Sequence, residues 1–100
     1  MIKYLNATEF EVRFLFEDLY EVKSPCGKEY DLGAMIDFEV IIKILGIKAL
    51  ISYDTKLGHT CSWSVCDQHL MSKHELDNNM RLVQLLDDKI CSIIKFMIEN

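Results

Sequence analysis

The residue types best suited to metal or nucleophilic chemistry are concentrated in residues 59–74. This window holds all three histidines, the only tryptophan and two of the four cysteines. Cysteine and histidine are the side chains that zinc prefers as ligands. The candidate ligands are Cys61, Cys66, His69 and His74, with His59 as a further imidazole. A zinc-stabilised regulatory domain is therefore one hypothesis for the function of the chain.

The spacing of these residues argues against zinc. Structural sites usually place paired cysteines about two to four residues apart on a tight knuckle, so that the ligands converge. A regular strand over 60–66 would instead put Cys61 on the same side as Trp63 and turn Cys66 to the other side. Only a bulge or an early strand end would reunite the two thiols. We therefore expect no cofactor, and we expect Cys61 to pack against a helix.

A cysteine nucleophile is the second chemistry that the sequence could support. Cys66 with His69, or Cys26 with one of the histidines, would still need a group that orients the imidazole and an oxyanion pocket. The chain contains no Gly-x-Ser-x-Gly elbow, phosphate loop or dinucleotide fingerprint. We therefore predict that the protein is not an enzyme.

Composition indicates one folded domain over residues 1–100. Half of the residues are hydrophobic and 27% are charged, a balance typical of a chain with a single core. No export signal precedes the four cysteines, which predicts reduced thiols and a cytoplasmic location. The longest apolar run, 36–51, contains charged residues and is too short for a bilayer span. The net charge of −5 argues against nucleic acid as a ligand and favours a partner protein with a basic surface.

Residues 9–23 alternate between apolar and charged side chains, which predicts a half-buried strand. Asp18 interrupts the alternation, so the segment is either one long strand with a bulge or two strands meeting there. A helix is the alternative, because Thr8 and Glu11 resemble a capping box. The strand interpretation places an acidic row on one sheet face, where it would meet a basic partner. The predicted contact residues are Glu9, Glu11, Arg13, Leu15, Glu17, Leu19 and Glu21.

The rest of the chain predicts one further hairpin strand, two helices and two more strands. A turn at 24–27 with Ser24 opposite Lys28 would place Tyr20 opposite Leu32. Apolar residues dominate 34–45, which predicts a buried helix closed by Gly46. Strands are expected over 48–53 and 60–66. Ser72 and Glu75 form a capping-box pattern that leads into a long C-terminal helix over 80–98.

These elements predict an α+β fold in the order β-β-α-β-β-α. An antiparallel sheet of about four strands would carry both helices on one face. The last helix also bears an apolar stripe with alternating spacings of three and four, which allows a homodimer. The stripe consists of Val83, Leu86, Ile90, Ile93 and Met97.

Three functions are compatible with these features of the sequence. The leading hypothesis is a small acidic binding protein of the inhibitor, immunity-protein or antitoxin type, which masks a basic partner surface. The zinc-stabilised domain is the second. The third is a winged-helix DNA-binding regulator with 36–45 as its recognition helix, although Lys43 would be the only basic residue of that helix.

Overall fold

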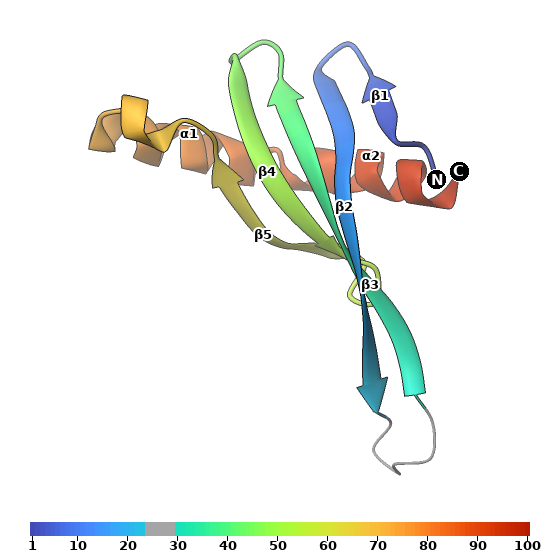
Figure 1. The fold of residues 1–100 in the computed structure, drawn as a ribbon. Coiled ribbons are helices and arrows are strands. Elements are labelled where there is room, and N and C mark those ends of the chain that lie inside the picture. The colour runs from blue at the N-terminus through green and yellow to red at the C-terminus, as the bar shows by residue number, and fades with distance from the viewer. Residues whose placement is uncertain (24–29) are drawn as a thin grey trace.

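The computed structural model describes residues 1–23 and 30–100 and shows an antiparallel sheet followed by two helices. Within that part of the chain, five strands form a meander in the order β1-β2-β3-β4-β5. Figure 1 shows both helices on one side of the sheet, called here the helix face; the opposite side is the outer face. The elements are β1 Tyr4–Asn6, β2 Phe10–Lys23, β3 Tyr30–Ile42, β4 Ile47–Asp54, β5 His59–Val65, the short 3-10 helix Gln68–Leu70, α1 Lys73–Leu85 and α2 Asp87–Glu99.

The predicted α+β class and antiparallel sheet are confirmed, but the predicted order is wrong because 34–45 is not a helix. Residues 30–42 form β3, and five alternate positions of this strand are buried: Ala34, Ile36, Phe38, Val40 and Ile42. β-branched and aromatic side chains favour a pleated strand, since a helix restricts their rotamers. Met35 and Ile41 are also apolar, although they lie on the opposite face of the strand. They hide the alternation of apolar and polar residues that would have indicated a strand. Residues 36–45 therefore do not form the recognition helix that was predicted for a winged-helix regulator.

Strand β2 is a single strand with a bulge, not a helix and not two strands. Phe14 pairs with Phe38 and Phe16 with Asp37, so Leu15 is the extra residue of the bulge. The break was predicted at Asp18, three residues later. The predicted hairpin register is also wrong by one position, because Tyr20 faces Gly33. The turn on which that register was based, including Cys26, lies outside the described residues.

A single apolar core lies between the sheet and the helices. Phe14 and Phe38 meet edge to face in this layer, with ring centroids 6.3 Å apart, a favourable geometry for aromatic pairs. The sheet contributes most of the buried side chains, and the helices contribute Val83, Ile90, Ile94 and Met97. The buried sheet residues are Phe10, Val12, Ala34, Ile36, Phe38, Val40, Ile42, Ile47, Ala49, Ile51, Tyr53 and Val65.

The predicted C-terminal helix is two helices, and the N-terminal cap predicted at Ser72 is confirmed. The Ser72 side chain accepts a hydrogen bond from the Glu75 N–H at 3.1 Å and so caps α1. Leu86 leaves the helical conformation, with φ −97° and ψ 2°. Asp87 and Asp88 then lie in the first turn of α2, where carboxylates stabilise the helix dipole. Neither helix in the described chain has the length and apolarity needed to cross a membrane.

The stripe that could have formed a dimer seam faces the chain's own sheet. Val83, Ile90 and Met97 are buried, and Leu86 and Ile93 are partly buried against the same core. Burial within one chain leaves this stripe without the exposed surface that a second chain would need.

Candidate functional site

The bulge at Leu15 divides the predicted acidic row between the two sheet faces. Before the bulge, Arg13 pairs with Glu39 on the outer face. After the bulge, Glu17 pairs with Ile36, which is buried on the helix face. Opposed residues of neighbouring strands project to the same side of a sheet. The predicted residues therefore do not share one face: Glu11 and Arg13 project outward, whereas Glu17, Leu19 and Glu21 project toward the helix face.

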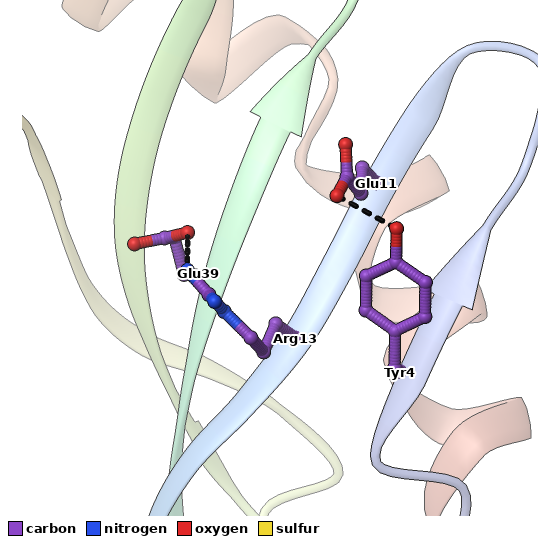
Figure 2. Close-up of polar contacts among 4 residues, drawn as sticks. All are labelled: Tyr4, Glu11, Arg13 and Glu39. Carbon is purple, nitrogen blue, oxygen red and sulfur yellow. Dashed lines mark hydrogen bonds and ion pairs between the residues drawn. The ribbon is translucent and has the colours of Figure 1, made fainter.

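The acidic residues of the outer face near β1 are engaged within the chain (Figure 2). The Tyr4 hydroxyl donates a hydrogen bond to Glu11 Oε1 at 2.7 Å, and this bond raises the pKa of Tyr4. Arg13 Nη2 lies 2.6 Å from Glu39 Oε1, with the Glu39 side chain only 15% exposed. Arg13 therefore offsets the charge of Glu39, whereas Glu11 keeps its negative charge and has one oxygen occupied by the Tyr4 hydroxyl.

Glu9 is separated from the rest of the row by its position in the turn between β1 and β2. Its carboxylate lies 3.6 Å from Lys89 Nζ of α2. Both residues line a largely apolar groove between this turn and the helix, together with Phe10 and Ile93.

The β2–β3 hairpin projects beyond the helices (Figure 1), and the exposed side chains described there include apolar and acidic ones. We call residues 15–21 of β2, with Leu32 of β3, the acidic arm. Leu19 is 71% exposed and Leu32 is 67% exposed. Since Leu19 pairs with Ala34 and Glu21 with Leu32, the two leucines are diagonal neighbours on the helix face. They form an apolar pair with acidic neighbours on the same face.

The carboxylates of the acidic arm are free of basic partners in the structure as described. Glu17, Asp18 and Glu21 are all exposed, and the ion pairs of the described residues involve Arg13 with Glu39 and Lys89 with Glu9. Free carboxylates next to exposed leucines are what an interface with a basic protein uses, because charge steers the encounter and apolar anchors supply affinity.

A hydrogen-bonded connection at Tyr20 holds the outer part of the arm against the β4–β5 turn. The Tyr20 hydroxyl donates to Asp54 Oδ1 at 2.6 Å, and the same oxygen accepts from the Lys56 N–H at 2.8 Å. The bond to Asp54 raises the pKa of Tyr20 to about 12, and the bond from Tyr20 lowers the pKa of Asp54. Gly33 makes room for the ring, since a Cβ there would lie 2.5 Å from Tyr20 Cζ.

The predicted zinc ligands are not gathered into a site. Within residues 1–23 and 30–100, no three histidine, cysteine or acidic side chains are placed to hold a metal ion. Cys61 occupies a second bulge, between Thr60 and Ser62, and its Sγ lies 3.1 Å from Met35 Sδ on the outer face. The expectation that Cys61 packs against a helix is therefore wrong.

The other candidate ligands lie on three successive segments after β5. Cys66 follows the strand directly, and burial raises the pKa of its thiol. His69 belongs to the 3-10 helix, and His74 lies in the first turn of α1; both are exposed. Their exposure agrees with loop or surface residues that stay hydrated.

Sequence reasoning missed Phe16, Asp18 and Leu32 as members of the exposed arm. Phe16 was expected in the core, yet it is 58% exposed. The signal in the sequence is the run from Phe14 through Leu15 to Phe16, the one place in β2 where three apolar residues are consecutive. Such a run breaks an alternating strand and is where an extra residue is best accommodated.

Comparison with known protein families, with curated proteins and with solved structures finds no match for this chain. The chain's own geometry is thus the basis for assigning its function.

Proposed function

We propose that this protein is a binding module that masks a basic surface of a partner protein with its acidic arm. The observation that carries the proposal is the pair Leu19 and Leu32, which are about two thirds exposed and lie among carboxylates that make no ion pair with the described residues. An inhibitor, immunity protein or antitoxin acts in this way, by occupying a surface and without chemistry of its own.

The leucines and the carboxylates of the acidic arm contribute to such binding in different ways. Full burial of a leucine is worth about 1.5–3 kcal/mol, so two leucines exposed to about two thirds leave roughly 2–4 kcal/mol for a partner to gain. The carboxylates of Glu17 and Glu21 add attraction for a basic surface and raise the rate of association at low salt. The arm therefore has an apolar anchor and an electrostatic guide on the same surface.

A charge-reversal experiment tests the proposal. The arm variant carries Glu17→Lys and Glu21→Lys; the control carries Asp77→Lys and Glu99→Lys, two exposed acidic residues on the helices. Both variants change the net charge by the same amount, and circular dichroism checks that both are folded. We expect proteins captured from native extract by the wild type and the control to be lost from the arm variant, and to elute as salt is raised.

The contrary results are equally definite. A set of captured proteins that is the same for the arm variant and the wild type would rule out the arm as the binding surface. Capture that persists unchanged in high salt would remove the electrostatic part of the proposal.

A further inference from the structure

Strand β2 has an open edge along the acidic arm. Strand β1 pairs with β2 only from Glu11 to Arg13, and the next backbone contact on that side is the hydrogen bond from Phe14 N to Lys3 O at 2.8 Å. Beyond it, residues 16–21 have a strand neighbour on one side only, β3. The backbone groups of an open edge can pair with an additional strand.

The other edges in the described chain are shorter or blocked. Strand β3 is closed at Ala34, whose N–H donates to Thr55 Oγ1 and whose carbonyl accepts from the Thr55 N–H. Strand β5 is interrupted by the bulge at Cys61, and bulges are one means by which edges are protected from pairing. The stretch 16–21 is thus the longest uninterrupted open edge that the structure describes.

The side chains along this edge carry acidic charge on both faces. Glu17 and Glu21 project toward the helix face, with Leu19 between them, because Glu17 pairs with Ile36 and Leu19 with Ala34. Asp18 projects to the outer face, where it pairs with Met35. A strand added here would meet a carboxylate on each face, and it would meet Leu19 at the centre of the helix face.

A second copy of this chain is a poor occupant of the edge. Antiparallel pairing of two β2 strands centred on Leu19 would place Glu17 of each copy opposite Glu21 of the other. Like charges directly opposed across a strand pair are destabilising. An extended segment with lysine or arginine opposite the three carboxylates, and apolar residues opposite Phe16 and Leu19, gives the complementary arrangement.

We propose that the partner contributes a basic, extended segment that adds to β2 as an antiparallel strand along residues 16–21. This inference rests on the proposed function and specifies how the acidic arm binds. Main-chain hydrogen bonds to the open edge supply part of the affinity, and alternate side chains of the segment supply the selectivity for basic residues.

A designed peptide tests the added strand directly. The probe is acetyl-Ser-Lys-Thr-Val-Lys-Lys-Val-Ser-amide, whose six central residues would lie antiparallel to 16–21, with lysines opposite Glu21, Asp18 and Glu17. Titration into the isotopically labelled full chain is followed by amide chemical shifts and hydrogen exchange. We expect shifts centred on 16–21. Exchange should slow roughly tenfold at every second amide of that stretch when the peptide is at about ten times its Kd, because only the unbound fraction exchanges.

Two controls separate the added strand from simple charge attraction. In the first, the peptide is N-methylated at alternate residues on the edge that would face β2, which removes its main-chain donors and leaves its charge unchanged. We expect its binding to be lost. In the second, the arm variant Glu17→Lys with Glu21→Lys should bind the unmethylated peptide roughly three- to tenfold more weakly, from two exposed ion pairs.

Each contrary outcome has a distinct meaning. Equal binding of the methylated peptide would overturn strand addition while leaving the acidic arm as the binding surface. Binding of neither peptide, or shifts confined to the helices, would also overturn strand addition, whereas the capture experiment decides the proposed function by itself. A dimer of the free protein with 16–21 already protected from exchange would show that a second copy occupies the edge.

Discussion

Replacing Ile90 with alanine tests whether the stripe on the last helix belongs to the core of one chain. Ile90 is fully buried, at 0% exposure, in the layer between α2 and the sheet. The substitution removes three carbon atoms, which is worth about 2.4 kcal/mol at roughly 0.8 kcal/mol each. The remaining cavity adds to this, so we expect a loss of about 3 kcal/mol in the free energy of unfolding.

Urea unfolding followed by circular dichroism measures the loss. With a slope of about 1.5 kcal/mol per molar urea, the midpoint of the Ile90→Ala variant should fall by about 2 M. The matched control is Leu85→Ala, since Leu85 loses the same number of carbon atoms and is 73% exposed. We expect the control to change stability by less than about 0.5 kcal/mol.

Two results would refute the assignment of the stripe to the core. An Ile90→Ala variant as stable as Leu85→Ala would show that the helix does not pack on the sheet as described. A wild-type midpoint that rises with protein concentration would show that unfolding is coupled to dissociation, and would make part of the stripe an interface between two chains.

Two further predictions concern the groups with shifted pKa values. The stability difference between wild type and Tyr20→Phe should be constant between about pH 5 and 9. It should shrink as pH rises from the usual Tyr pKa of 10.0 toward about 12, because Tyr20 keeps its proton longer when folded. It should also shrink as pH falls below 3.8, because Asp54 has a lowered pKa when folded. Urea unfolding of both proteins measures the difference, and a difference in stability that does not change with pH would contradict the hydrogen bond between Tyr20 and Asp54. Iodoacetamide should modify exposed Cys61 roughly tenfold faster than Cys66, because burial raises the pKa of the Cys66 thiol. Equimolar zinc should leave the modification rates of both cysteines unchanged. Mass mapping of the alkylated peptides checks this, and equal protection of both cysteines by zinc would restore the metal hypothesis.

The sequence predicted elements well where local chemistry and periodicity agreed. Ser72 caps α1 as expected, and the strands expected over 48–53 and 60–66 are β4 and β5. It failed for β3, because apolar residues occur on both parities of that strand. Met35 and Ile41 can remain on the outer face since no helix covers that side. Local pattern alone does not reveal which side of a strand the helices will cover.

The site was predictable in composition and unpredictable in geometry. The sequence identified Glu17, Leu19 and Glu21 as members of one surface, and they share a face. It could not separate them from Glu11 and Arg13, because one extra residue at Leu15 reverses the direction of every later side chain. The even positions stay apolar through Phe16, so the three consecutive apolar residues 14–16 are the one sign of the bulge in the sequence.

This bulge gives the two halves of β2 different electrostatic roles. Before it, Arg13 offsets the charge of Glu39 on the outer face, and the Tyr4 hydroxyl holds Glu11 in place. After it, the acidic arm runs from the three-stranded part of the sheet at 16–18 into a two-stranded ribbon at 19–21, and its carboxylates have no basic partner among the described residues. Screening at about 0.1 M salt limits a charge to about 10 Å, so a partner approaching the arm meets these carboxylates rather than the paired ones.

The same ribbon explains why an added strand would have a structural effect as well as a binding energy. A two-stranded hairpin alone is marginally stable in water, and a third strand is what usually makes such a ribbon stable. Within the described chain, the bonds from Tyr20 to Asp54 and between Ala34 and Thr55 hold the two-stranded part of the arm against the β4–β5 turn. Strand addition along 16–21 would support the same part from the open edge of β2. Removing the bond with Tyr20→Phe should therefore weaken peptide binding even though the hydroxyl contacts no peptide atom.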